Sequence, residues 1–206
     1  GGMPFDRFMA ERVIGPLDAD QVMLTHGGQN AIGLVLSICL RGDRPVVLTE
    51  DLSYPGFRYA ARLARAEVVG IEMDEEGMRP DALEAACRRH GTLLVLDETH
   101  TVSSGLGGHG RLLGLAPDFV VVGKAVAGGM PCAVYGFTAA VAERLRAAKD
   151  AAPDGHSGIG TTLSAGLLGL AALRATLAEV MTPAAYTVMV QGAGRLQAGL
   201  AQVNAA

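Results

Sequence analysis

Residues 117–129 read PDFVVVGKAVAGG, and this stretch places a lysine directly after a run of apolar β-branched residues. Such residues favour strands, and a strand without polar alternation is typical of one buried on both faces of a sheet. The glycines and alanines that follow leave room for a backbone turn and for a bound group. Lys124 is therefore expected at the end of a buried strand, where a cation is costly unless it reaches solvent or has a partner.

The rest of the chain alternates short β-rich runs with longer segments rich in Ala, Leu and Arg. Strands are predicted at residues 21–25, 45–49, 66–71, 92–96, 119–122 and 133–137. Helices are predicted at residues 30–40, 55–65, 80–90, 138–149 and 163–177, with another after Pro183. This alternation predicts an α/β fold, a three-layer α/β/α arrangement around a mostly parallel sheet. The runs PVVLT, LLVL and FVVV are continuously apolar, so these strands are expected to be buried on both faces.

Composition narrows the classes of function. Of the 206 residues, 50% are hydrophobic and 18% are charged, which predicts a sizeable core and argues against disorder. A net charge of -4 and the absence of Trp disfavour a nucleic-acid partner. The His and Cys residues show no metal-ligand spacing, and the cysteines are expected to be small buried hydrophobes. No segment suggests a signal peptide or a membrane span, so a cytoplasmic protein without membrane contact is expected.

Two charged residues follow buried strands at the edge where open parallel sheets bind their ligands. Asp97 ends LLVLD, and Lys124 ends the next such strand. Taken alone, the aspartate suits a helix cap or a turn, and the lysine suits a side chain that extends to solvent. Together they indicate pyridoxal phosphate, which needs a lysine amine for a Schiff base and an acid beside its ring nitrogen. A lysine desolvated there would lose its proton more readily and become a nucleophile.

Other motifs at the expected strand ends add to this hypothesis. In THGGQNAIGL, Gly27 and Gly28 stand at a strand-to-helix turn that could bind a phosphate, although a tight turn with an Asn-assisted cap also fits. Tyr54 in DLSYPGF could cover a ring or be an ordinary partly buried tyrosine. The stretch GLGGHG at residues 105–110 formally fits G-x-G-x-x-G. It lies several residues past a strand and has no acidic residue at the ribose distance, so a dinucleotide site is not predicted.

The motifs GGQNA, EDLSYPGF, LVLDETHT, PDFVVVGKAVAGGMP and GTTLSAG together resemble those of the fold-type-I pyridoxal-phosphate enzymes, in practice the aminotransferases. The last three resemble the class III aminotransferases, the group that includes glutamate-1-semialdehyde aminomutase. The first half is instead similar to class I and regulator-type aminotransferase domains. This mixture suggests a chimeric or minimised chain. The resemblance implies that residues 1–206 form a single cofactor-binding large-domain core without the family's small C-terminal domain.

Carried over by motif, the resemblance assigns roles to individual residues. The implied cofactor-binding residues are Gly27, Gly28, Gln29, Tyr54, Asp97, His100, Lys124, Thr161 and Thr162. Lys124 is the implied Schiff-base lysine and Asp97 the partner of the ring nitrogen, and these two are the expected catalytic residues. His100 corresponds to a side chain near the phenolic oxygen, although a solvated loop histidine fits equally. Thr161 or Thr162 would reach the phosphate of the partner subunit, which implies a homodimer with shared active sites.

The resemblance also implies a reaction. An amino group is expected to pass from an amino acid or amine to a 2-oxo acid, with Lys124 moving the proton at the substrate's α-carbon as base and acid. Three alternatives remain open: a sensor or remnant that holds the cofactor with little turnover, an aminomutase, racemase or decarboxylase on the same fold, and a scaffold without a cofactor. The Lys124–Asp97 pair argues against the scaffold.

Overall fold

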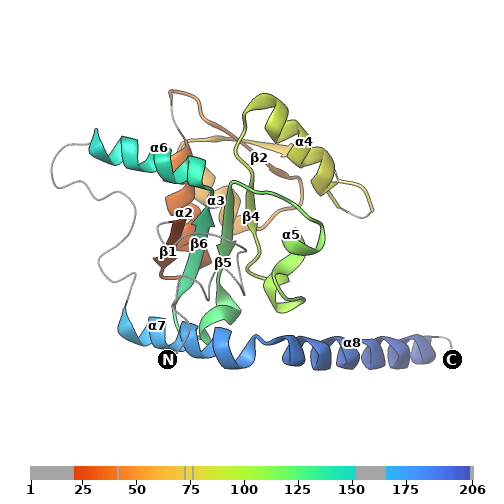
Figure 1. Ribbon diagram of the computed structural model, residues 1–206. Coiled ribbons are helices and arrows are strands. Elements are labelled where there is room, and N and C mark those ends of the chain that lie inside the picture. The colour runs from red at the N-terminus through yellow and green to blue at the C-terminus, as the bar shows by residue number, and fades with distance from the viewer. Residues whose placement is uncertain (1–20, 41, 72, 76, 152–165, 205–206) are drawn as a thin grey trace.

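The computed structural model describes residues 21–40, 42–71, 73–75, 77–151 and 166–204, and strands and helices alternate along it (Figure 1). Each predicted strand and helix has a counterpart. The elements are β1 (Val22–Thr25), α2 (Gly28–Cys39), β2 (Val46–Glu50), α3 (Pro55–Leu63), β3 (Glu67–Ile71), α4 (Pro80–His90), β4 (Val95–Asp97), the 3₁₀ helix η3 (Thr101–Ser103), α5 (Gly108–Leu112), β5 (Phe119–Val122), the 3₁₀ helix η4 (Lys124–Ala127), β6 (Ala133–Phe137), α6 (Ala139–Asp150), α7 (Leu167–Ala175), the π-helix η5 (Thr176–Val180) and α8 (Pro183–Asn204).

The strands form two sheets. The larger sheet has the order β1-β6-β5-β4, in which β4 and β5 are parallel and β6 is antiparallel to both of its neighbours. The smaller sheet pairs β2 with β3 in parallel. Within the larger sheet only β6 runs against the other strands, which confirms the mostly parallel α/β architecture. The division into two sheets was not predicted.

This division corrects one expectation. β5 is buried, with Phe119 at 1% exposure, but β2 and β4 are not buried on both faces: Leu48 is 45% exposed and Val95 is 37% exposed. β2 pairs only with β3 and β4 only with β5, so each is an edge strand. A strand at an edge has no neighbour on one side, and the helices above it cover it only in part. A continuous apolar run therefore did not establish burial on both faces.

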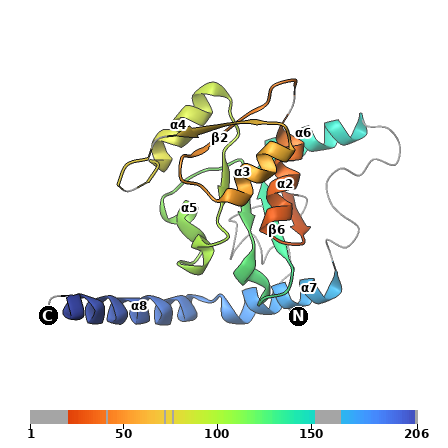
Figure 2. The same ribbon diagram turned by 180° about the vertical axis from the view of Figure 1, so that it is seen from behind.

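Two hydrophobic clusters lie on opposite faces of the larger sheet. Val121 and Tyr135 belong to one cluster, which α2, α3 and α6 cover. Val122 and Val134 belong to the other, which contains Leu173 and neighbouring residues of α7 and η5. Successive residues of a strand point to opposite faces, so adjacent positions serve the two clusters. The result is the expected three-layer arrangement, which Figures 1 and 2 show from opposite sides.

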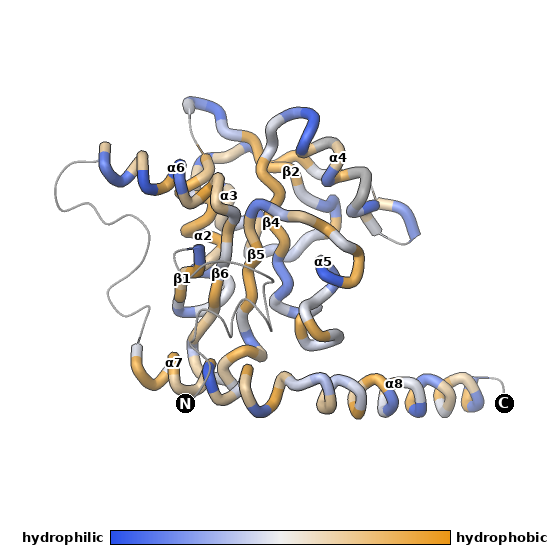
Figure 3. The backbone as a smooth tube through the Cα atoms, viewed as in Figure 1, coloured by the Kyte–Doolittle hydropathy of each residue, from blue (hydrophilic) through white to orange (hydrophobic). Residues whose placement is uncertain are grey.

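Helix α8 extends away from the two sheets (Figure 3). Tyr186 is its buried residue, and the Tyr186 hydroxyl donates to the Val102 carbonyl at 2.5 Å. Farther along, apolar side chains such as Leu196 and Leu200 are exposed. No single helix among the described residues is long and apolar enough to cross a bilayer. The segments Leu167–Val180 and Pro183–Asn204 reach that length and hydropathy only as a pair, and they meet at a bend of 68°.

Candidate active site at the strand ends

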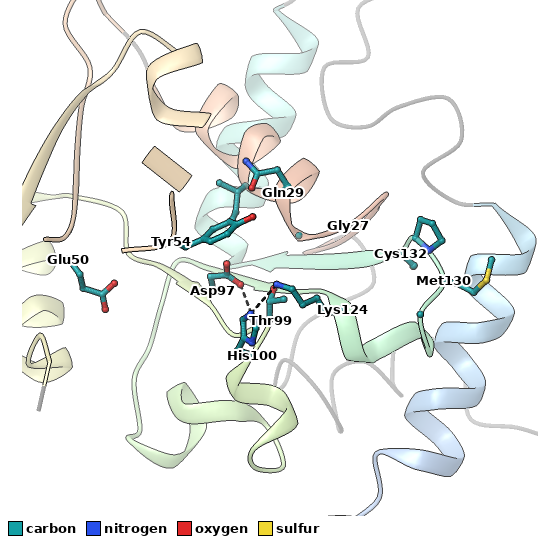
Figure 4. Close-up of a pocket in the computed structure, with 14 residues that line it drawn as sticks. Gly27, Gln29, Glu50, Tyr54, Asp97, Thr99, His100, Lys124, Met130 and Cys132 are labelled. Carbon is teal, nitrogen blue, oxygen red and sulfur yellow. Dashed lines mark hydrogen bonds between the residues drawn. The ribbon is translucent and has the colours of Figure 1, made fainter. Parts of the chain in front are cut away.

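The carboxyl ends of β1, β2, β4 and β5 lead into one pocket of about 790 Å³ (Figure 4). Its lining residues are Gly27, Gly28, Gln29, Ile32, Glu50, Tyr54, Asp97, Thr99, His100, Lys124, Gly129, Met130, Pro131 and Cys132. Every site residue expected from the sequence that lies within the described chain is among them. Thr161 and Thr162, with the surrounding GTTLSAG motif, lie outside the described residues.

Lys124 begins the 3₁₀ helix η4 directly after β5. Its φ angle is 44°, in the left-handed region that side chains other than glycine rarely adopt. Strained backbone of this kind is concentrated at functional sites. The Lys124 Nζ lies 3.1 Å from His100 Nε2 and 5.9 Å from the centroid of the Tyr54 ring. Two candidate side chains from two other segments therefore lie near the Lys124 amine.

Lys124 is exposed in the pocket, as expected for a lysine that extends to solvent, and not desolvated as the alternative interpretation required. β5 ends at Val122, and the chain then turns, which takes the lysine out of the buried part of the sheet. The turn passes close to α2, since a Cβ on Gly123 would lie 3.0 Å from the Gly28 nitrogen. A larger residue at position 123 would push against the α2 backbone, so glycine favours this approach.

Asp97 ends β4 and faces the same pocket. Its Oδ1 accepts a hydrogen bond from the Thr99 backbone N–H at 3.0 Å. Within the described part of the chain, Asp97 forms no ion pair. No described side chain therefore supplies a cation to Asp97, and its carboxylate is available to a positively charged group bound in the pocket.

Glu98, which sequence reasoning missed, fixes the loop after β4. It is 6% exposed and accepts hydrogen bonds from the backbone N–H groups of His109 and Gly110 and from the Thr101 hydroxyl. A Cβ at Gly108 or Gly110 would lie 2.3 Å or 2.7 Å from the Glu98 carboxylate. The GLGGHG stretch is thus a cradle for the chain's own carboxylate, and it anchors the loop that carries His100. A carboxylate directly after a strand, followed by closely spaced glycines, was the available signal.

The N-terminus of α2 forms another wall of the pocket. Gly27 precedes the helix with a φ of 124°, and its carbonyl accepts the N–H groups of Asn30 and Ala31. The N–H groups of Gly28 and Gln29 have no acceptor within the described chain. Free N–H groups at the positive end of a helix dipole favour an anion. The Asn30 side chain accepts the His26 N–H at 3.4 Å and so closes the turn before the helix, but among the described residues no side-chain hydrogen bond caps α2.

Tyr54 and Gln29 lie against the start of α3. The Gln29 Nε2 donates to the Gly56 carbonyl at 2.9 Å. A Cβ on Gly56 would lie 2.5 Å from both the Tyr54 ring and the Gln29 Oε1. Only glycine at this position leaves space for both side chains, and the tyrosine ring stands at the pocket with 56% of the residue exposed.

This set of groups fits pyridoxal phosphate. The pocket volume is in the range of cofactor sites. The Lys124 amine, the Asp97 carboxylate, the N–H groups of Gly28 and Gln29 and the Tyr54 ring all line the pocket. They match an aldehyde, a ring nitrogen, a phosphate and a flat ring. The lining residues that the sequence did not single out are Ile32, Glu50, Thr99, Gly129, Met130, Pro131 and Cys132. Burial raises the pKa of the Cys132 thiol, which keeps it protonated.

The family model for aminotransferase class III matches residues 70–206. The chain belongs to the class III aminotransferase family. Among its relatives, glutamate-1-semialdehyde 2,1-aminomutase of Thermus thermophilus is 33% identical over 197 residues, which cover 91% of this chain and 44% of that protein. The aminomutase of an Anaeromyxobacter species is 37% identical over 141 residues, covering 67% of this chain and 30% of that protein. The class III chain therefore spans less than half the length of these relatives.

One solved structure gives the same family and a second gives the same fold. A glutamate-1-semialdehyde aminomutase from Pseudomonas aeruginosa PAO1, solved in complex with PMP, superposes with a TM-score of 0.72 at 30% identity over 95% of this chain and 54% of that one. An ω-transaminase from Sphaerobacter thermophilus shares the fold. It is 21% identical, with a TM-score of 0.61 over 89% of this chain and 55% of that one. These findings confirm the expected fold-type-I pyridoxal-phosphate enzyme of class III. The chimeric origin of the class III chain stays a prediction.

Proposed function

We propose that this class III chain transfers amino groups with pyridoxal phosphate held at Lys124. The observation that carries the proposal is the convergence of the Lys124 amine, the Asp97 carboxylate and the open N-terminus of α2 on one pocket. Only two lysines, Lys124 and Lys149, occur in the whole sequence, and Lys149 lies on α6 outside the pocket lining. Lys124 is thus the one lysine amine that lines the pocket.

The chain's residues have separate tasks in holding the cofactor. The free N–H groups of Gly28 and Gln29, next to Gly27, would bind the phosphate. Tyr54 would cover the ring. Asp97 would form an ion pair with the protonated ring nitrogen, and this nitrogen would be the cation that no described side chain supplies to the carboxylate. When bound, pyridoxal phosphate withdraws electrons from the bonds beside the transferred nitrogen.

Lys124 and His100 supply the acid–base chemistry. With 3.1 Å between Nζ and Nε2, one of the two nitrogens donates a hydrogen bond to the other. A free Lys124 amine would take the proton from the substrate's α-carbon, and His100 would orient the amine and exchange the proton with solvent. Both side chains are exposed in the pocket, which allows that exchange.

The substrates and assembly follow the same proposal. The donor is an amino acid or amine and the acceptor a 2-oxo acid, in a cytoplasmic homodimer. A second candidate is aminomutation, in which the amino group returns to another carbon of the same molecule. The names of the relatives that match this chain favour it, because they are glutamate-1-semialdehyde aminomutases.

The first experiment locates the cofactor. After incubation with pyridoxal phosphate and reduction with borohydride, mass mapping should find the pyridoxyl group on the peptide that contains Lys124. Lys124→Ala should remove the label, and Lys149→Ala should keep it. A label on Lys149 alone, or its persistence in Lys124→Ala, would contradict the assignment.

The second experiment separates the reactions. Amino transfer from a panel of amines to pyruvate or 2-oxoglutarate would support the aminotransferase, and isomerisation of glutamate 1-semialdehyde without an acceptor would support the aminomutase. A chain that is labelled at Lys124 but turns over none of these substrates would be a cofactor-holding module.

A further inference from the structure

Thr99 carries a buried hydroxyl that no described residue pairs with. The residue is 4% exposed, and its Oγ1 has no hydrogen-bond partner among the described residues. Buried polar groups in native proteins are almost always hydrogen-bonded, because an unpaired one loses its hydration without compensation. Thr99 also lines the pocket. Its hydroxyl is therefore a group whose partner is expected to be a bound ligand.

The position of this hydroxyl indicates which part of a ligand it meets. The Thr99 N–H is already used by Asp97 Oδ1, which holds the residue at the end of β4. On the other side, a Cβ on Gly28 would lie 3.1 Å from Thr99 Oγ1. The hydroxyl thus lies beside the first residue of α2, a helix of 12 residues whose first two N–H groups have no acceptor among the described residues.

We propose that Thr99 is an additional ligand-binding residue whose Oγ1 donates a hydrogen bond to a phosphate oxygen bound at the N-terminus of α2. Three donors then converge on the anion: the N–H groups of Gly28 and Gln29 and the Thr99 hydroxyl. A phosphate oxygen accepts several such bonds, whereas an apolar side chain at position 99 would offer none. The inference rests on the proposed function insofar as the phosphate belongs to pyridoxal phosphate.

Loss of the Thr99 hydroxyl should have opposite effects on the ligand-free and the ligand-bound protein. Thr99→Val keeps the branched shape but removes the hydroxyl, so the ligand-free chain no longer buries an unpaired group. Its melting temperature should rise by a few degrees. The affinity for pyridoxal phosphate should fall about tenfold, the worth of one hydrogen bond to a charged acceptor. Thr99→Ser, which keeps the hydroxyl, should bind within about threefold of the original chain.

A matched control is available in Thr138. Its Oγ1 is also buried with no hydrogen-bond partner in the described part of the chain, but it lies at the start of α6 and outside the pocket lining. Thr138→Val should raise the melting temperature in the same way and leave pyridoxal phosphate binding unchanged. Comparing Thr99→Val with Thr138→Val separates two effects: the stability gained by removing an unpaired buried hydroxyl, and the affinity lost by removing a ligand contact.

Three probes identify the contact: pyridoxal phosphate, pyridoxal, which has no phosphate, and inorganic phosphate, each followed by calorimetry or thermal shift. Thr99→Val should weaken both phosphate-containing probes and spare pyridoxal. Equal weakening of pyridoxal and pyridoxal phosphate would overturn the phosphate assignment, as would a lower melting temperature with unchanged affinities. If the original chain binds inorganic phosphate but not pyridoxal phosphate, the proposed function fails. The measurements with inorganic phosphate would then still show whether Thr99 contacts a bound phosphate. If it binds neither, both are overturned.

Discussion

Among single residues, Lys124 combines a reactive side chain with an unfavourable backbone. Its φ of 44° is a conformation that glycine adopts freely and lysine does not. The surrounding structure holds it there: Gly123 lies against Gly28, and the 3₁₀ turn begins at once. The amine is placed among Tyr54, His100 and the α2 N-terminus at the expense of local stability.

We expect Lys124→Gly to stabilise the ligand-free chain by about 1 kcal/mol, because glycine removes the left-handed strain. Lys124→Ala, which keeps the strain, should not share the gain. Urea unfolding of the ligand-free variants would measure both.

Arg65 provides the control for this prediction, since its φ is 58° and it lies outside the pocket. Arg65→Gly should give a similar gain and leave cofactor labelling intact. A Lys124→Gly chain less stable than Lys124→Ala would show that the backbone at this position is not strained.

At the scale of elements, the segment from β4 to α5 determines the geometry of the site. Asp97, Thr99 and His100 line the pocket, and Glu98 between them points into the glycine cradle. The Glu98 carboxylate hydrogen-bonds to the backbone of α5. Gly108 and Gly110 allow this close approach because a Cβ at either position would collide with the carboxylate. The loop is therefore fixed by a contact that points away from the pocket.

Gly110→Ala should destabilise the chain by about 1–3 kcal/mol, because its Cβ would lie 2.7 Å from Glu98 Oε1 and 2.8 Å from Leu96 Cδ1. Alanine is the better helix former, so propensity alone predicts the opposite sign. Denaturant unfolding of the ligand-free chain would give the value.

Gly105 is the matched control, because a Cβ there meets nothing within 4 Å. Gly105→Ala should be close to neutral in the same measurement. Equal effects of the two substitutions, or a stabilised Gly110→Ala chain, would refute the cradle as the reason for the glycine.

At the scale of the whole molecule, α7 and α8 carry several exposed apolar side chains. Leu167 and Leu168 are 86% and 67% exposed, and Leu196 and Leu200 are 65% and 55% exposed. Exposed apolar surface of this kind marks an interaction surface. It accords with the homodimer that the sequence resemblance implied.

Sedimentation at micromolar concentration should therefore give the mass of two chains, with dissociation on dilution. Ending the chain after Gln191 removes Leu196 and Leu200 but keeps Tyr186, so it should weaken association while the single chain stays folded. A mass of one chain at every concentration would contradict the dimer.

Much of the fold was predictable from local sequence. Apolar runs and turn residues set the strands and helices to within a few residues, since these signals depend on neighbours in sequence. The lysine and the aspartate were found because ligand sites lie at the carboxyl ends of parallel strands. The first turn of α2 was found from its glycines for the same reason.

The sequence by itself thus determined the alternation of elements, the strand ends and the chemistry-bearing side chains there. Tertiary structure decided the division into two sheets, the exposure of Lys124, its contact with His100, the Glu98 cradle and the unpaired Thr99 hydroxyl. Each of these depends on which segments far apart in sequence come into contact. A periodic pattern describes the surface that a segment can bury, but burial, hydrogen-bond pairing and backbone strain are properties of the packed neighbours.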